Sequence, residues 1–396
     1  MRILTTAIGM TTAAALLFGA ELTTGPSQLV THEWGTFTSV AQENGNAVEW
    51  APLLGPPDLP CFVTRGQEVR KAALKGLVRM ETPVLYFYSP KPTTLSVHVS
   101  FPHGLITEWY PNPLPSVKTD NNGWGSRTDM WWNQLHVLPG KDLNYPVTEG
   151  PSHYYAARNT DSTPLRIGTE EEKMIFYRGL GNFAPPLRAL YDEAGRLEIH
   201  NTGAEPIPFA IAFENQRGAV GFRIAENVAS SVTLDAPELT QDLPALRQYL
   251  VAHLTGLGLY PKEALAMVDT WADSWFTEGS RVFYIVPRPT VDALLPLSIA
   301  PAPTEIQRVF VGRLEVLSPR TKDTIQRALR AGDSDTLTAF GRFLEPFIAQ
   351  IQREDRCFVL SLTSKTYLHA IETGQQVSGD GYGGTALKSG TAACVE

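Results

Sequence analysis

The sequence lacks the short motifs that mark the common catalytic and nucleotide-binding sites. It contains no HExxH, no GxSxG, no P-loop and no EF-hand loop. A literal GxGxxG occurs at Gly379, Gly381 and Gly384, but no strand pattern precedes it and no helix pattern follows it. Because the dinucleotide-binding form needs that strand-to-helix context, we expect no nucleotide site there.

Positive charge is also in short supply. The 396 residues include 33 Lys and Arg against 41 Asp and Glu, which gives a formal net charge of -8. Proteins that bind nucleic acid usually present a basic patch. The charge balance therefore predicts no nucleic-acid partner.

Cysteines are few, and their spacing fits no CxxC metal or redox motif. The three are Cys61, Cys357 and Cys394. In an oxidising compartment we expect one disulfide between the early and late parts of the chain. We favour Cys61–Cys357 because Cys394 lies in a Gly-, Ser- and Thr-rich tail. Three buried thiols are the alternative.

Long apolar runs are absent after the N-terminus, where a single one occurs. Arg2 precedes the uncharged, mostly apolar stretch from Ile3 to Ala20, which is the layout of an export signal. Phe18 stands where a small residue is preferred before the cleavage point. Residues 1–20 are therefore either a signal peptide or an uncleaved anchor, which would be the only membrane contact. We expect a secreted or periplasmic protein.

The dominant pattern is that of short β-strands separated by turns. Leu95, Val97, Val99 and Phe101 alternate with polar residues, as in a half-buried strand. Such segments recur across residues 28–235 without helical patterns between them, which predicts an antiparallel β-sandwich region. The predicted strands include residues 29–40, 80–89, 95–101, 106–110, 131–138, 154–159, 173–180, 196–200, 207–213 and 219–224.

Residues 236–373 are predicted to form a mixed region of helices and strands. Leucines at helical spacing follow Asp242, and a second helix begins at Pro261 and runs to Thr277, which together predict a helical hairpin. A strand is expected over residues 281–286. A helix follows Ser318, and another, kinked at Pro346, runs from about residue 335 to 354. Residues 374–396 are predicted to be a mobile tail. The whole chain predicts an α+β fold, mostly β, with the sandwich region packed against the mixed region.

Four glutamates stand beside aromatic residues or arginines and are the candidate catalytic groups: Glu33, Glu81, Glu108 and Glu278. Two carboxylates flanking a glycosidic bond suffice for its hydrolysis. Candidate substrate-binding residues are Trp34, Trp109, Arg158, Arg178 and Arg281. With export and many aromatics, these residues favour a carbohydrate-active protein, either a glycoside hydrolase or a polysaccharide binder.

Two alternatives stay open. The same glutamates and arginines would serve equally well as buried ion pairs in a non-enzymatic envelope or interaction protein. The β-rich part also contains six histidines that a sheet could bring together as metal ligands, although no pair has a typical ligand spacing. These are His32, His98, His103, His136, His153 and His200. We assign no metal ligand among them, and the cofactor is unknown.

Two tryptophans, Trp271 and Trp275, lie one helical turn apart on an apolar stripe. Large aromatic residues on such stripes are usually buried. We expect them to hold the helix against the following strand. An aromatic wall beside Asp269, Asp273 and Glu278 is the functional alternative.

Six segments together resemble an uncharacterised family of exported bacterial proteins. They are THEWGTFTSV, METPVLYFY, FPHGLITEWYP, YYAAR, IFYRGLG and DSWFTEGSRVFYIVPRP. The resemblance covers most of the chain after the first 20 residues, and it implies export and a single shared architecture. It implies no activity and no catalytic residue.

Overall fold

The computed structural model describes residues 28–53, 58–66, 74–120, 125–150, 152–355 and 358. Over these residues the fold is α+β and mostly β, as predicted. Helices of the described residues are all too short or too polar to cross a membrane. Residues 1–20 and 374–396, predicted as a signal or anchor and as a tail, lie outside the described ranges.

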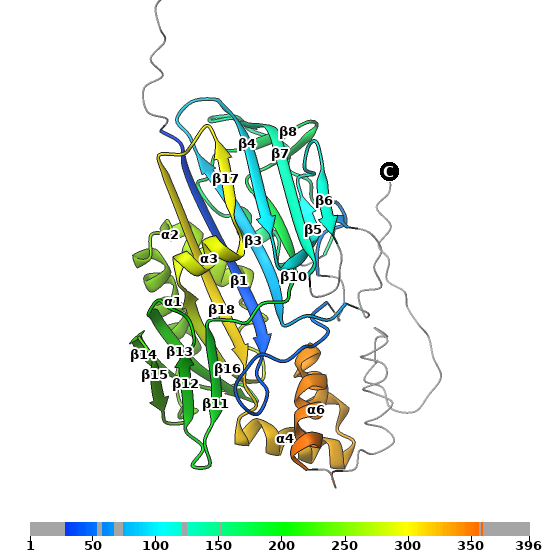
Figure 1. The fold of residues 1–396 in the computed structure, drawn as a ribbon, viewed down its shortest axis with the longest axis vertical. Coiled ribbons are helices and arrows are strands. Elements are labelled where there is room, and N and C mark those ends of the chain that lie inside the picture. Colours follow the sequence, from blue (N-terminus) through cyan, green and yellow to red (C-terminus); the bar gives the residue numbers. More distant parts are fainter. Residues whose placement is uncertain are drawn as a thin grey trace, which may run out of the picture.

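A nine-stranded sheet forms the centre of the molecule (Figure 1). Its strands, in spatial order, are β14 (Ala219–Val228), β13 (Ile207–Gln216), β16 (Gly279–Val286), β18 (Glu305–Glu315), β1 (Val30–Val40), β3 (Val78–Tyr88), β10 (Ile175–Gly181), β5 (Gly104–Tyr110) and β2 (Thr64–Arg65). β16 and β18, from the predicted mixed region, lie between β13 and β1 of the predicted sandwich region. Strands of both regions therefore share one sheet.

One pair of strands, which joins the predicted antiparallel region to the predicted mixed region, is parallel. β1 and β18 run parallel, with Val30 opposite Glu305 and Val40 opposite Glu315. A parallel pair needs a long crossover connection. Here the connection spans most of the chain, so no local sequence pattern reveals the direction of pairing.

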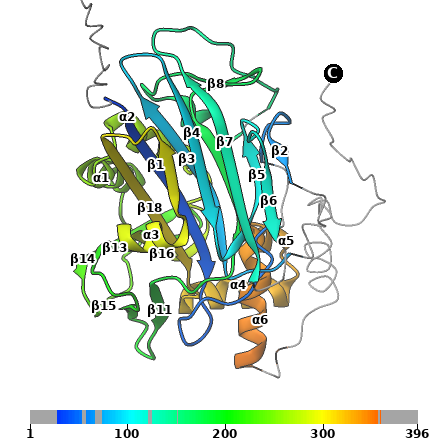
Figure 2. The ribbon, with the colours of Figure 1, turned by 45° about the horizontal axis from the view of Figure 1, so that its top comes forward.

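Two smaller antiparallel sheets cover one face of the nine-stranded sheet, which we call the sandwich face (Figure 2). The six-stranded sheet contains β17 (Leu297–Ala300), β4 (Thr93–Phe101), β7 (Arg127–Val137), β8 (Leu165–Ile167), β9 (Glu170–Glu172) and β6 (Val117–Asp120). The three-stranded sheet contains β11 (Leu187–Tyr191), β12 (Leu197–Asn201) and β15 (Ser231–Leu234). α3 (Arg288–Leu294) adds Val291 to the same core. Side chains alternate between the two sides of β4 and of β7, and the apolar side of each strand faces this core.

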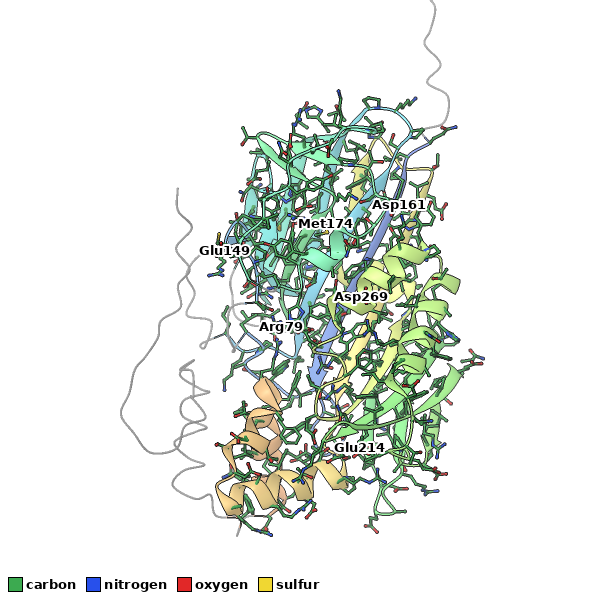
Figure 3. All side chains as sticks on the ribbon, turned by 180° about the vertical axis from the view of Figure 1, so that it is seen from behind. Arg79, Glu149, Asp161, Met174, Glu214 and Asp269 are labelled. Carbon is green, nitrogen blue, oxygen red and sulfur yellow. The ribbon has the colours of Figure 1, made fainter. Side chains whose placement is uncertain are left out.

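The opposite face, which we call the helix face, is covered by α1 (Leu243–Gly256) and α2 (Pro261–Thr270), visible from behind in Figure 3. The helical hairpin forms, but α2 ends at Thr270 and a turn follows. Trp271 and Trp275 are buried at 3% and 0% exposure in the aromatic core of this face, as expected for core residues. The predicted strand over residues 154–159 is wrong, because Tyr155–Arg158 forms a 3-10 helix against α2.

Short helices close the lower end of the sheet. They are α4 (Pro319–Ala331), α5 (Ser334–Thr338), the 3-10 helix η4 (Gly341–Phe343) and α6 (Leu344–Glu354). Ser318 caps α4 by accepting a hydrogen bond from the Thr321 N–H at 3.1 Å, and Gly332 ends it with φ 71°. The predicted kink at Pro346 is wrong. The chain breaks before α6, and Pro346 lies in the first turn, where its missing N–H needs no partner.

Cys61 is disulfide-bonded, so the expectation of one disulfide is confirmed and the alternative of three free thiols is wrong. Its partner is one of the two remaining cysteines, Cys357 and Cys394, which both lie outside the described residues. The bond therefore ties the early sheet to the C-terminal part of the chain, as expected.

Candidate functional site

The four predicted catalytic glutamates do not meet in one cavity. Glu33 lies on the sandwich face, where it is 0% exposed and accepts hydrogen bonds from the Tyr177 hydroxyl and from Arg308 Nε at 2.5 Å. Its neighbour His32 contacts α2 on the helix face, as the strand alternation predicts. Glu33 is therefore half of a buried ion pair within the sandwich core.

Glu81 and Glu108 belong to a row of buried and partly buried charges across the helix face. We call this set the charged row: Asp58, Arg79, Glu81, Glu108, Arg178 and Arg342. Arg178 contacts Asp58 at 2.8 Å and Glu108 at 3.2 Å. Arg79 contacts Glu81 at 3.2 Å and Asp58 at 3.6 Å. Arg342 of η4 completes the row by contacting Glu81 at 3.3 Å.

Charge pairing controls the ionisation of the charged row. Burial by itself would raise the pKa of Asp58, but the attraction of Arg178 and Arg79 outweighs it and holds that pKa well below its usual range. Burial by itself would lower the pKa of Arg178, but the attraction of Glu108 and Asp58 outweighs it and raises that pKa. Asp58 and Arg178 are thus held in their charged forms by their neighbours, which is the behaviour of a structural ion network.

Glu278 precedes β16, and Arg281 lies near the start of that strand. Burial raises the pKa of Glu278, whose Oε2 accepts the backbone N–H of Arg217 at 2.7 Å. Arg281 is buried and contacts Glu315 at 3.0 Å, and desolvation lowers its pKa to about 10. Its guanidinium donates to the carbonyl oxygens of Trp275 and Glu278 and so fixes the turn after α2.

The predicted substrate-binding aromatics are also interior residues. Trp34 is 0% and Trp109 8% exposed, and they lie in the helix-face and sandwich-face cores respectively. Arg158 donates hydrogen bonds from Nε and Nη2 to the carboxylate of the buried Glu172, and Nη2 lies 2.6 Å from Glu172 Oε2. Its guanidinium lies 5.2–5.6 Å from the ring centres of Phe62, Tyr145, Tyr154 and Tyr155. It therefore organises the loop over the helix face.

The histidines are dispersed among separate partners. His32 pairs with Glu263 at 2.7 Å, His98 with Asp129 at 3.0 Å, and His153 with the Thr270 carbonyl at 2.8 Å. His136 contacts Thr94, and His200 contacts Glu198. Within the described ranges, no three potential metal ligands come together.

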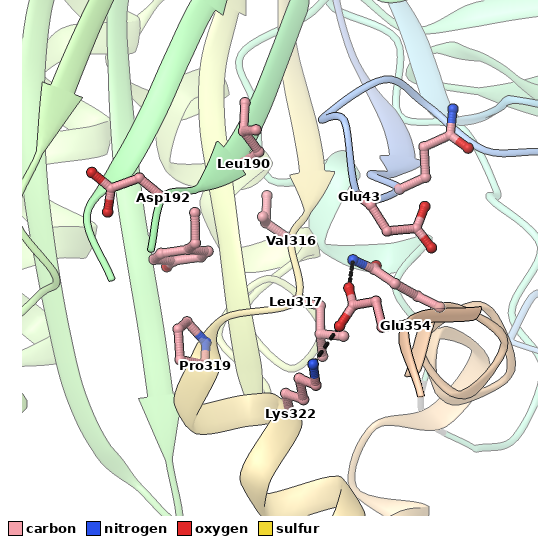
Figure 4. A pocket seen from close by; sticks show the side chains of 11 residues that line it. Glu43, Leu190, Asp192, Val316, Leu317, Pro319, Lys322 and Glu354 are labelled. Carbon is pink, nitrogen blue, oxygen red and sulfur yellow. Dashed lines mark hydrogen bonds and ion pairs between the residues drawn. The ribbon is translucent and has the colours of Figure 1, made fainter. Parts of the chain in front are cut away.

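A polar pocket that the sequence did not predict lies at the lower end of the molecule (Figure 4). We call it the lower pocket; its cavity volume is about 240 Å³. β11, the loop after β1, the chain from β18 into α4, and α6 all contribute to it. Its lining residues are Gln42, Glu43, Leu190, Tyr191, Asp192, Val316, Leu317, Pro319, Lys322, Gln350 and Glu354.

Acceptor groups dominate the walls of the lower pocket. In the view of Figure 4, Asp192 stands on one side and Glu43 and Glu354 on the other, with Val316 and Leu317 between them. Glu43 contacts Arg353 at 2.7 Å and Asp192 contacts Arg196 at 2.8 Å. Glu354 accepts from Lys322, the one cationic side chain lining this pocket.

Gln350 is the one deeply buried polar side chain of the lower pocket. Its residue is 7% exposed, and its Nε2 donates to Glu354 Oε1 at 3.1 Å. Its Oε1 is buried and has no hydrogen-bond partner among the described residues. A buried acceptor without a partner costs about 1–3 kcal/mol, so a ligand that donates to it after the amide turns toward the cavity gains affinity.

No sequence signal pointed to the lower pocket. Its polar groups come from chain segments about 310 residues apart, as the contact between Glu43 and Arg353 shows. Each is an ordinary surface carboxylate or amide when taken alone. Gln350 and Glu354 do stand four residues apart on α6, but that spacing is common on exposed helices.

A second hollow, with a cavity volume of about 440 Å³, lies between α1 and α2. It is mostly apolar, and Leu265 on its rim is 49% exposed. Its one charged group, Arg247, already contacts Asp269 at 2.6 Å. This hollow offers few groups that could orient a polar ligand.

Comparison with known proteins adds no functional assignment. No family model matches the chain, and no curated protein matches it at significant similarity.

Proposed function

We propose that this is an exported carbohydrate-binding protein that holds one small sugar in the lower pocket and does not hydrolyse it. The observation that carries the proposal is the amide of Gln350, a residue that lines a pocket of carboxylates and whose buried Oε1 has no partner within the described part of the chain. Sugars present several hydroxyl donors close together, and carboxylate and amide oxygens accept from such donors.

The shape and lining of the pocket support a small ligand. Its volume of about 240 Å³ is below the ~300–1,000 Å³ typical of pockets for drug-sized ligands. Leu190, Val316, Leu317 and Pro319 supply an apolar surface for the C–H side of a ring. One sugar unit, with polar edges and an apolar face, matches this combination.

Binding without hydrolysis is favoured by the state of the carboxylates. Hydrolysis needs one carboxylic acid that stays protonated until it transfers its proton. The backbone N–H and side chain of Arg196 instead lower the pKa of Asp192. Glu43 and Glu354 each accept a hydrogen bond from a cationic side chain. The buried Glu33, Glu81 and Glu108 cannot serve either, because each is already ion-paired away from solvent.

Calorimetric titration of the full chain with a panel of monosaccharides tests the proposal. We expect at least one monosaccharide to bind, and Gln350→Leu to weaken it tenfold or more because the amide acceptor is lost. Gln248→Leu, which makes the same change in the hollow between α1 and α2, is the matched control and should bind normally. Absence of binding to the whole panel, or equal binding by a folded Gln350→Leu variant, would contradict the proposal.

A further inference from the structure

We infer that the sugar bound in the lower pocket is an amino sugar with a free, protonated amino group. This inference rests on the proposed function and names its ligand class. The pocket's own lining carries three carboxylates, Glu43, Asp192 and Glu354, against one ammonium, Lys322. Its wall therefore attracts positive charge.

The cations that contact two of these carboxylates come from outside the lining and are exposed. The side chains of Arg353 and Arg196 are 47% and 53% exposed, respectively. Exposed ion pairs contribute little net stability, because both partners remain well solvated when they separate. A ligand ammonium can therefore share Glu43 or Asp192 with its arginine at small cost.

The contact between Lys322 and Glu354 shows that an ammonium fits against this wall. An ammonium offers three donors and no acceptor. The lower pocket has the complementary need, since the buried Gln350 Oε1 lacks a donor among the described residues and lies on the same helix as Glu354. A ligand ammonium in the place of Lys322 can donate to Glu354. It reaches Gln350 Oε1, which Lys322 does not contact, only if the Gln350 amide turns toward it.

The apolar part of the lining distinguishes an amino sugar from a bare cation. Val316, Leu317 and Pro319 have no ligand atoms for a metal ion in their side chains, but they suit the carbon face of a ring. An amino sugar combines that face with hydroxyl donors and a positive charge. Lys322, whose side chain is 34% exposed, then acts as an internal competitor that swings away when the ligand enters.

Titration with three related sugars tests the inference. They are glucosamine, glucose and N-acetylglucosamine, which differ in one substituent, and the pH is one at which the amine of glucosamine is protonated. We expect glucosamine to bind at least tenfold more tightly than the other two, and added salt to weaken it selectively, since charge attraction is screened. Glucose or N-acetylglucosamine binding as tightly as glucosamine would overturn the inference and leave the proposed function standing. Failure of every sugar to bind would overturn both.

Two substitutions separate charge recognition from general sugar binding. Lys322→Met should raise the affinity for glucosamine threefold or more, because the competing ammonium is gone, and leave that for glucose nearly unchanged. Glu354→Gln keeps the shape and removes the charge, so it should reduce the preference for glucosamine over glucose at least fivefold. Weaker glucosamine binding by Lys322→Met, or an unchanged preference in Glu354→Gln, would overturn the inference.

Discussion

The charged row and the lower pocket are built from the same kinds of side chain, yet they differ in how those groups are satisfied. In the charged row, carboxylates and guanidiniums of neighbouring strands pair with one another inside the protein, as Arg178 does with Glu108. In the lower pocket, the paired cations are half exposed and one buried acceptor is left over. Arg79 Nε and Arg178 Nε of the charged row also lack a hydrogen-bond partner within the described residues. What distinguishes the lower pocket is therefore the exposure of its paired cations and the cavity beside its unpaired amide.

Breaking the charged row should have the largest effect. Arg178→Ala removes the guanidinium that pairs with both Asp58 and the buried Glu108, and so breaks two ion pairs at once. We expect the free energy of unfolding in urea to fall by about 3–5 kcal/mol. Asp323→Ala, which breaks the exposed pair with Arg327, should cost about 0–1 kcal/mol. Comparable losses in the two variants would refute the view that the row is a buried network.

Changing one carboxylate of the row should give a smaller, pH-dependent effect. Asp58→Asn should cost about 1.5–3 kcal/mol at pH 7, as expected for hydrogen bonds to a charged group. The folded-state pKa of Asp58 lies below the unfolded value of about 3.9. Its contribution is therefore complete above the unfolded pKa and is lost as the pH falls toward the folded one.

Unfolding curves of the wild type and Asp58→Asn between pH 7 and 3 measure this difference. The stability gap should stay constant down to about pH 5 and narrow below about pH 4. A gap that widens on acidification would show that the pKa of Asp58 is raised in the folded protein, and would remove the ion-pair interpretation of this residue.

A substitution in the lower pocket should affect sugar binding more than stability. Gln350→Leu removes a buried acceptor that has no partner within the described ranges, which favours folding, and also the hydrogen bond from Nε2 to Glu354, which opposes it. Because the two effects offset each other, we expect the free energy of unfolding to change by less than about 1 kcal/mol. Sugar binding should nevertheless fall by tenfold or more. Calorimetry and urea unfolding on the same preparation give both values. A large loss of stability together with retained binding would reverse the roles assigned to the two regions.

Lys322→Met should have the smallest effect on stability. It breaks a pair between two partly exposed side chains on α4 and α6, which is worth about 0–1 kcal/mol. Thermal unfolding should therefore differ little from that of the wild type. A drop as large as that of Arg178→Ala would mean that this pair holds the C-terminal helices in place.

Most of the local structure follows from the sequence. The alternation along β4 and the start of α4 after Ser318 both occur where the pattern places them. The errors arise where tertiary contacts override local preference. Tyr155–Arg158 has the aromatic content of a strand but forms a helical turn, because Arg158 is held by Glu172 and four rings. α2 stops at Thr270, and the following turn buries Trp275 with Phe283.

The candidate site was predicted less well than the fold. Glutamates beside aromatics and arginines suggested catalytic carboxylates. Adjacency in the sequence does not say whether a carboxylate faces solvent or a guanidinium. Glu33 and Arg308 are 275 residues apart and form a pair only because β1 and β18 are neighbours. The groups of the lower pocket carried no shared pattern at all.

The sequence alone determined the mostly β composition, the approximate positions of most long strands, the cap at Ser318 and the acidic balance, because these depend on periodicity and residue type over a few neighbours. The tertiary structure decided which strands lie side by side, which charges are paired and where a buried amide lacks a partner within the described chain. These properties depend on contacts between segments hundreds of residues apart. Such contacts form only when strands that are distant in the sequence pair with one another, as β1 and β18 do.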